Sequence, residues 1–185
     1  TAILKNNNNG KWNFISARGY HFNTLEKKTP TDIYNLKSIN SHGYPGGILE
    51  PPDYFMLVNK TEKQGDWLNL VFHVECDDDG VINYLPKKDL WVDTIGNVIK
   101  YIKLRDNAQI SSIVVGNNKL TFTIKSSLKE SYYKQNLTIK LIDKKKPLSI
   151  SYNSKVIPFK LAKDGSPIFD VSFPIDGLVE VIYGK

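Results

Sequence analysis

The sequence predicts an α/β segment followed by an all-β segment, with the change near Asn107. Before Asn107, apolar strand-like runs alternate with helical patterns, and after it only short alternating strands and turns remain. The chain has 185 residues, of which 41% are hydrophobic, so it can bury the core of one ordinary domain or of two small ones. We therefore expect two domains, residues 1–107 and residues 108–185.

The first segment contains two strand-like runs and one clear helix signal. Residues 11–17 predict a short strand, and Arg18 begins the loop that follows it. Residues 41–47 are dense in turn-forming residues and predict a surface loop. Pro51 and Pro52 suit a first helical turn, and Gly65 is expected to end that helix. Residues 66–73 predict a strand that is buried on both faces, as in a parallel sheet, and that ends on His73.

A second strand-then-helix unit follows. Residues 90–92 predict a short strand, and Asp93 or Thr94 is expected to cap the next helix. That helix has its apolar residues at positions 95, 98, 99 and 102, the spacing of one buried helical face. Two such units in succession indicate α/β architecture.

The second segment predicts six or seven short strands spaced about ten residues apart, which is typical of a small β-sandwich. Turn-forming residues at 116–118 and 163–166 separate some of them. The expected strands are residues 113–115, 119–124, 137–142, 148–152, 156–159, 168–171 and 178–183.

The net charge and the cysteine content exclude some partners and some kinds of site. The net charge is +6, but of the 25 basic residues only Arg18 and Arg105 are arginine, and the lysines are spread along the chain. Recognition of phosphate and guanine favours arginine, so we expect no nucleic-acid partner and a lysine-rich solvated surface. The single cysteine, Cys76, excludes an internal disulfide and is expected to be a buried thiol. No apolar run is long enough to span a membrane.

Three histidines, His21, His42 and His73, are the candidates for chemistry, and none lies three or four residues from another. A metal site on one helix face is therefore not predicted. Residues 75–80 resemble the start of a calcium loop, but the twelfth position is Pro86 instead of glutamate, so an exposed acidic turn is expected. His73 at a strand end and Arg18 after another remain as candidates, and a structural role for His73 is equally open.

The order of these segments is similar to the last third of a polysaccharide deacetylase domain of the NodB-like family. The resemblance is carried by residues 65–73, which end in an apolar-x-His pattern, and by residues 89–106, with Trp91, Asp93-Thr94 and Tyr101-Ile102. Residues 16–20 look like the arginine-bearing strand end of that family. The resemblance implies that the first segment is an incomplete half of a deacetylase-type (β/α) barrel and that a β-sandwich is appended to it.

The family's chemistry is metal-assisted hydrolysis of acetyl amides or esters. The resemblance implies that His73 is the general acid toward the leaving group and that Arg18 orients the catalytic base. It places Tyr20 and His21 at the carbohydrate substrate. Trp67 and Trp91 are expected to pack the barrel instead of touching sugar.

The family's Thr-Phe-Asp-Asp and His-x-x-x-His type motifs are missing from these 185 residues. The resemblance therefore implies a zinc-like divalent metal whose ligands are not in this chain, and an N-terminal partner fragment or second chain that holds them. It also implies a secreted or cell-surface location. The alternative is a non-catalytic carbohydrate-binding or cell-surface module, for which Tyr132, Tyr133 and Tyr152 are the candidate sugar-stacking rings.

Overall fold

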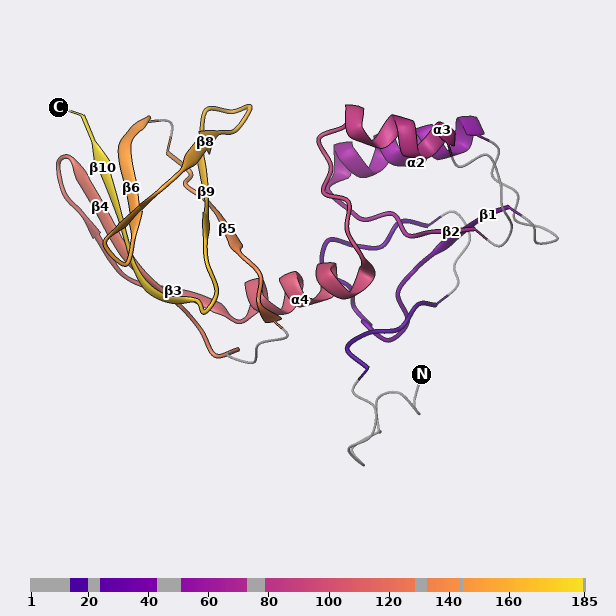
Figure 1. Ribbon diagram of the computed structural model, residues 1–185, viewed down its shortest axis with the longest axis horizontal. Helices are drawn as coiled ribbons and strands as arrows, with labels where there is room; N and C mark the ends of the chain where they lie inside the picture. Colours follow the sequence, from indigo (N-terminus) through magenta and orange to yellow (C-terminus); the bar gives the residue numbers. More distant parts are fainter. Residues whose placement is uncertain are drawn as a thin grey trace. The chain divides into compact units, whose positions relative to one another are not determined.

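The computed structural model describes residues 14–19, 24–42, 51–72, 79–128, 133–143 and 145–184. The chain forms two compact units, residues 1–99 and 100–185 (Figure 1). The fold is α plus β, with mostly antiparallel sheets and few helices, and no barrel is closed within these ranges. The boundary that the sequence predicts at Asn107 lies just after helix α4 (Ile95–Asp106), whereas the two units divide inside that helix.

Helix α2 (Pro51–Gln64) begins and ends where the sequence predicts. Its first two residues are prolines, whose missing N–H groups cost nothing in a first turn. It ends before Gly65, which adopts φ +69°, a conformation that glycine accepts without strain and that stops the helix.

The first unit has a small sheet covered by helices. Strands β1 (Ile39–His42) and β2 (Leu70–Phe72) pair in parallel, and α2 is the crossover between them. Helix α3 (Asp79–Tyr84) runs beside α2 (Figure 1), and the turn η1 (Leu85–Lys87) follows it. The core between helices and strands is made of Leu25, Ile39, Tyr54, Leu57 and Val81.

Three strand predictions in this unit need correction. Residues 90–92 form no strand, because they find no partner strand and line a cavity instead. Of the strand predicted at 11–17, residues 11–13 lie outside the described residues, and 14–17 pair with the chain only through single backbone hydrogen bonds. The strand predicted at 66–73 is shorter, since only Leu70–Phe72 pairs with β1, and Leu70 and Val71 are half-buried.

Helix α4 has the cap that the sequence predicts. The Thr94 hydroxyl accepts a hydrogen bond from Asn97 N at 3.3 Å, and Asp93 Oδ1 accepts one from Thr94 N at 2.7 Å. Ile99 and Ile102 are buried on its apolar face. Among the described residues, no helix combines the length and the apolar character that crossing a bilayer requires.

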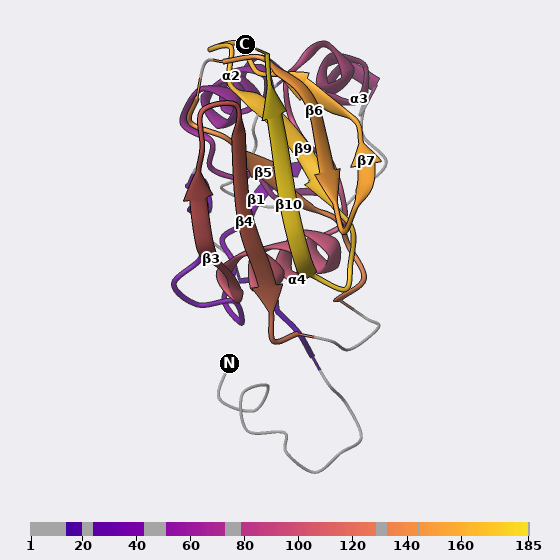
Figure 2. The same ribbon diagram turned by 90° about the vertical axis from the view of Figure 1, so that its left-hand side faces the viewer.

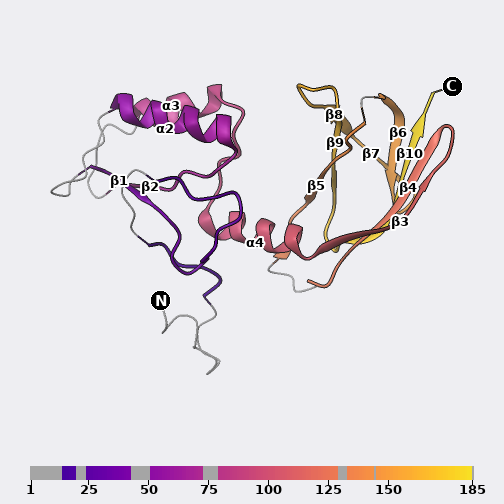
Figure 3. The ribbon, with the colours of Figure 1, turned by 180° about the vertical axis from the view of Figure 1, so that it is seen from behind.

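The second unit consists of two antiparallel sheets, and the strand order of the larger is visible in Figure 2. Figure 3 shows the two sheets as separate layers. The five-stranded sheet has the order β3 (Ala108–Val115), β4 (Lys119–Ser126), β10 (Asp176–Tyr183), β6 (Pro147–Tyr152) and β7 (Lys155–Ile157). The three-stranded sheet has the order β5 (Leu137–Lys140), β9 (Pro167–Val171) and β8 (Phe159–Leu161).

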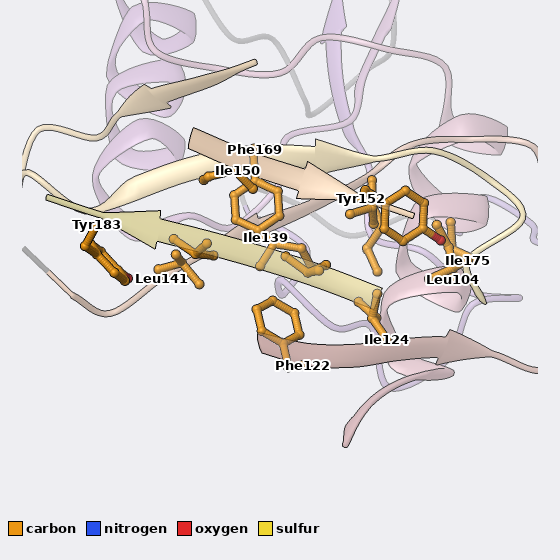
Figure 4. Close-up of a cluster of buried hydrophobic side chains, with 14 residues drawn as sticks. Leu104, Phe122, Ile124, Ile139, Leu141, Ile150, Tyr152, Phe169, Ile175 and Tyr183 are labelled. Carbon is orange, nitrogen blue, oxygen red and sulfur yellow. The ribbon is translucent and has the colours of Figure 1, made fainter. Parts of the chain in front are cut away.

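Side chains from both sheets meet in one core, as alternation in the sequence predicts (Figure 4). Phe122 of β4 and Val181 of β10 contribute from the larger sheet, and Ile139 of β5 and Phe169 of β9 from the smaller. Along β10 and β9, buried residues alternate with more exposed ones, the pattern of a strand with one face in a core. Six of the seven predicted sandwich strands are therefore present, with bounds shifted by a few residues. The strand predicted at 156–159 is instead divided into β7 and β8, which belong to different sheets.

Candidate functional site

Three segments of the first unit, residues 17–19, residues 36–42 and β2, run parallel to one another. Ala17 O accepts a hydrogen bond from Leu36 N at 3.0 Å, and Gly19 N donates to Leu36 O at 2.7 Å, which makes a parallel bridge between Arg18 and Leu36. The same stretch continues into β1, where Ile39 N donates to Asn69 O at 2.8 Å. The segment at 17–19, the stretch 36–42 and β2 therefore lie side by side with one polarity. In α/β folds, side chains at the carboxyl ends of parallel strands carry the chemistry.

Close contacts fix the arginine-bearing segment against its neighbour. Ser38 is fully buried, and its hydroxyl donates to Gly19 O at 2.6 Å. A Cβ on Gly19 would lie 2.0 Å from Asn35 Oδ1, so a larger residue at this position would displace the Asn35 side chain. The same Cβ would lie 3.2 Å from Leu36 O, so the absence of a side chain at Gly19 leaves room for both the Asn35 side chain and the Leu36 carbonyl.

Of the four predicted site residues, Arg18, Tyr20, His21 and His73, the structure describes only Arg18. Arg18 is exposed and lies level with Leu36, six residues before the end of β1. At about 3.3 Å per extended residue, this puts Arg18 as much as about 20 Å from the level at which β1 ends. Tyr20, His21 and His73 lie outside the described residues, so the catalytic and substrate-binding roles given to these residues and to Arg18 stay predictions.

His42 belongs to a strand, where the sequence predicts a loop, and it lies level with the end of β2. The turn-rich run at 41–47 predicts a loop, but Ser41 and His42 belong to β1. His42 is in register with Phe72, the residue that precedes His73 in the chain. The apolar residue Ile39, ahead of the turn-forming residues, is the signal that could have extended a strand to this point.

A cavity of about 450 Å³ lies in the first unit between α2, α3, the residues leading into β2, and residues 89–98. Most of its wall is apolar, with side chains such as Val58, Leu68 and Val98. Two tryptophans and four carboxylates also line it. They are Trp67, Trp91, Glu62, Asp66, Asp89 and Asp93, and we call the space the Trp91 cavity.

The two tryptophans of the Trp91 cavity differ in their surroundings. The Trp67 indole N–H donates to Lys27 O at 2.7 Å, and its ring is half-buried, as expected for a packing residue. Trp91 is 54% exposed, so the expectation that it packs inside a barrel is not met. The reason is that residues 90–92 are not a strand and carry the ring to the cavity rim.

Three of the four carboxylates of the Trp91 cavity accept hydrogen bonds from backbone N–H groups. Asp93 Oδ1 accepts from Asn97 Nδ2 and from Thr94 N, both at 2.7 Å, and these hydrogen bonds lower the pKa of Asp93 below its ordinary value. Glu62 Oε1 accepts from Asp89 N at 3.0 Å. Asp66 Oδ1 accepts from Lys28 N at 3.3 Å.

The ammonium group of Lys88, near the cavity, contacts a carboxylate and an aromatic ring. Lys88 Nζ lies 3.5 Å from Glu62 Oε2 and 4.7 Å from the centre of the Tyr84 ring. A hydrogen bond between Tyr84 and Lys88 is the main cause of a lowered pKa of Tyr84 and a raised pKa of Lys88. No lysine, arginine or histidine appears among the described residues that line the cavity.

The described residues do not form a metal centre. They contain no group of three or more histidine, cysteine, aspartate or glutamate side chains that could hold an ion. Cys76 and the acidic run at 75–78 lie outside them. The metal that the deacetylase resemblance implies therefore has no donor set in these ranges, and we derive no step through it.

Two of the three rings expected on a sugar-binding face of the second unit are buried. Tyr133 is 6% exposed and Tyr152 is 7% exposed, and both are buried. The Tyr152 hydroxyl accepts a hydrogen bond from Asp176 N at 3.0 Å, which ties the ring to the start of β10. Neither ring can stack on a sugar, and Tyr132 lies outside the described residues.

The fold and these sites define a two-unit α plus β protein with a parallel βαβ unit and an antiparallel sandwich. No protein-family model matches the chain, and no curated protein matches it.

Proposed function

We propose that the first unit is part of a carbohydrate deacetylase that removes acetyl groups from an amino-sugar polymer. The observation that carries the proposal is the parallel arrangement of the segment at 17–19, the stretch 36–42 and β2, with α2 as crossover. This is the polarity required of successive strands of a (β/α) barrel. β2 ends one residue before His73, the residue that matches the general acid in the resemblance.

The proposed chemistry of this chain is proton transfer. His73 donates a proton to the amine that leaves as the acetyl C–N bond breaks, which makes the amine a better leaving group. The resemblance gives Arg18 the role of holding the carboxylate base through a charge-assisted hydrogen bond, although Arg18 lies as much as about 20 Å along the strands from the level at which β1 ends. The divalent metal supplies activated water when bound, and we place its ligands in a further polypeptide segment. We also place the activity outside the cell or at its surface.

The test is acetate release from N-acetylated chito-oligosaccharide by the natural gene product that carries this sequence. His73→Asn should lower kcat/KM by about 10²-fold to 10⁴-fold and remove the limb of the pH profile that His73 sets. The two arginines give a matched pair: Arg18→Lys should lower activity, whereas Arg105→Lys, on α4 beside Asp106, should not. Unchanged kcat/KM in His73→Asn would overturn the proposal.

The place of the metal ligands is tested separately. Intact-mass measurement of the purified natural product should show either a longer chain or a second polypeptide that copurifies with this one. Acetate release by these 185 residues alone, in the presence of zinc, would contradict the need for a further segment.

A further inference from the structure

We propose that one end of the sandwich attaches the protein to an anionic lipid surface. This end, which we call the Tyr183 end, consists of the turn between β3 and β4, the residues between β5 and β6, and the end of β10. Its apolar side chains enter the boundary between head groups and acyl chains, and its lysines lie against the lipid phosphates. The surface belongs to the second unit, so it does not depend on the deacetylase chemistry proposed for the first unit.

The three segments of the Tyr183 end meet around Tyr183. Tyr183 N donates to Asn118 O at 2.9 Å, which joins the end of β10 to the turn between β3 and β4, and Tyr183 is in register with Pro147 at the start of β6. Burial is the first cause of the raised pKa of Tyr183 and the charge of Asp143 is the second, so Asp143 lies near its hydroxyl. Figure 2 shows the β3–β4 turn, the start of β6 and the end of β10 at the same end of the larger sheet.

Exposed apolar side chains gather at this end. Ile142 is 100% exposed, Val115 is 78% exposed and Leu148 is 71% exposed, and these are the three most exposed large apolar side chains among the described residues. Val115 ends β3, Ile142 lies two residues after β5, and Leu148 is the second residue of β6. Single exposed apolar residues are common, but the three most exposed ones at one end of a unit indicate an interaction surface.

The backbone holds Ile142 in this exposed position. Leu141 N donates to Pro167 O at 3.0 Å, and the Leu141 side chain is buried, so the alternation of β5 continues and turns Ile142 outward. Asp143 Oδ1 accepts from Lys145 N at 3.0 Å, which fixes the turn that follows. The apolar side chain is therefore presented without any rearrangement of the sandwich.

Positive charge lies beside the apolar side chains. Residues 144–146 are the only run of three basic residues in the sequence, and Lys145 and Lys146 are exposed between Ile142 and Leu148. A lipid surface with anionic head groups complements this charge, and each lysine near such a surface strengthens attachment.

The acidic side chains of the Tyr183 end do not cancel this charge. Asp164 Oδ2 accepts a hydrogen bond from Lys140 Nζ at 2.6 Å, and Glu180 pairs with Lys119. Within the part of the chain that the structure describes, no ion pair engages the two lysines of the run.

The combination of features favours a lipid surface as the occupant. A fully exposed side chain such as Ile142 protrudes from its own surface, and a fluid interface accepts it without a matching cavity. Attachment to membranes by apolar groups alone is weak and becomes stable when a basic patch is added. The Tyr183 end carries both within a few residues of one another.

The experiment measures cosedimentation of the natural gene product with vesicles of phosphatidylcholine alone and with vesicles of equal parts phosphatidylcholine and phosphatidylglycerol. We expect at least about 10-fold tighter binding to the anionic vesicles, because only they complement the lysines. This affinity should fall as salt increases. Equal affinity for the two compositions, or binding to neither, would overturn the proposal.

Apolar variants test insertion into the lipid. Ile142→Ser should weaken binding to the anionic vesicles by about 10-fold, and Leu148→Ser should weaken it in the same direction. Val156→Ser is the matched control, because Val156 is 70% exposed but lies on β7 in register with Ser151, toward the other end of the sandwich. It should change nothing. Unchanged binding in both Ile142→Ser and Leu148→Ser would overturn the proposal.

Basic variants test the choice of lipid. Lys145→Gln combined with Lys146→Gln should weaken binding to the anionic vesicles by about 10-fold or more and leave binding to phosphatidylcholine unchanged. Lys155→Gln, an exposed lysine on β7, is the control and should have no effect. An equal effect of the double variant and the control would contradict the role of the lysine run.

A second copy of the chain is the competing occupant. Sedimentation velocity without lipid should give a mass that does not depend on protein concentration. A dimer that dissociates in Ile142→Ser, together with absence of vesicle binding, would assign the Tyr183 end to self-association and overturn the proposal. His73→Asn should bind vesicles as the wild type does, so the lipid surface and the deacetylase function are tested separately.

Discussion

Glu26 and Trp67 join two distant parts of the first unit by a reciprocal pair of backbone hydrogen bonds. Glu26 N donates to Trp67 O at 3.0 Å, and Trp67 N donates to Glu26 O at 2.9 Å. The Glu26 side chain is 4% exposed and accepts hydrogen bonds from Lys27 N and Lys37 N, both at 2.8 Å. This pair holds one wall of the Trp91 cavity, because Trp67 lines it.

Glu26→Ala is expected to lower the free energy of unfolding by about 2–4 kcal/mol, because two backbone N–H groups lose a buried acceptor. Urea denaturation followed by tryptophan fluorescence measures the change. Glu180→Ala is the control, since Glu180 pairs with Lys119 at the surface of the sandwich and should cost less than about 1 kcal/mol. Equal effects of the two substitutions would contradict the role of Glu26.

Gly177→Ala is expected to destabilise the sandwich by about 2–4 kcal/mol. An added Cβ would lie 2.1 Å from Asn153 Oδ1, which accepts a hydrogen bond from Leu178 N at 3.0 Å. Asn153 itself has φ +49°, which glycine tolerates. The substitution should therefore cost less in an Asn153→Gly background, and a double-mutant cycle measures the difference. Additive effects would show that the close approach of Gly177 and Asn153 does not matter.

Tyr183→Phe is expected to leave the free energy of unfolding unchanged or to raise it by up to about 1 kcal/mol. The Tyr183 hydroxyl is buried and makes no hydrogen bond of good geometry among the described residues, so its removal deletes a poorly compensated polar group. Burial, and then the negative charge of Asp143, raise the pKa of Tyr183. Because the folded state disfavours the phenolate, wild-type stability should fall as the pH rises above 10, less steeply in Tyr183→Phe. Thermal unfolding at several pH values tests this, and a clear loss of stability in Tyr183→Phe at neutral pH would contradict it.

Asp164 should titrate well below an ordinary aspartate. A hydrogen bond from Lys140 Nζ at 2.6 Å, followed by one from Ser166 N, lowers the pKa of Asp164 to about 2. The folded state therefore favours the carboxylate, and this contribution to stability is present above pH 3.8 and is lost as the pH falls toward about 2. NMR titration of the Asp164 carboxyl should give this value, and Lys140→Ala should raise it. An unchanged midpoint in Lys140→Ala would show that Lys140 is not the cause.

The sequence predicted the elements whose bounds depend on residues that are close together in the chain. Pro51 and Gly65 bound α2, and Thr94 caps α4, because capping and proline effects act within a few residues. The alternation after Asn107 predicted the sandwich strands, since a strand with one face in a core must alternate.

Short apolar runs were harder to interpret. Residues 90–92 have strand composition but no partner strand, and β1 extends into Ser41 and His42 although both belong to a turn-rich run. A strand of three or four residues is stabilised by the backbone of its neighbour, and its own sequence carries too little information to predict it.

The candidate site, like the fold, was predicted from the sequence only in part. The sequence alone marked Arg18 and His73 as candidates, and it determined the two helices, the alternating strands and the net positive charge. Only the tertiary structure decided that Asp66, Asp89, Asp93 and Trp91 line one cavity, since these residues are brought together by packing of α2 and α3 with the chain around β2. A cavity forms where separate elements fail to fill the space between them, and that depends on contacts between residues distant in the chain.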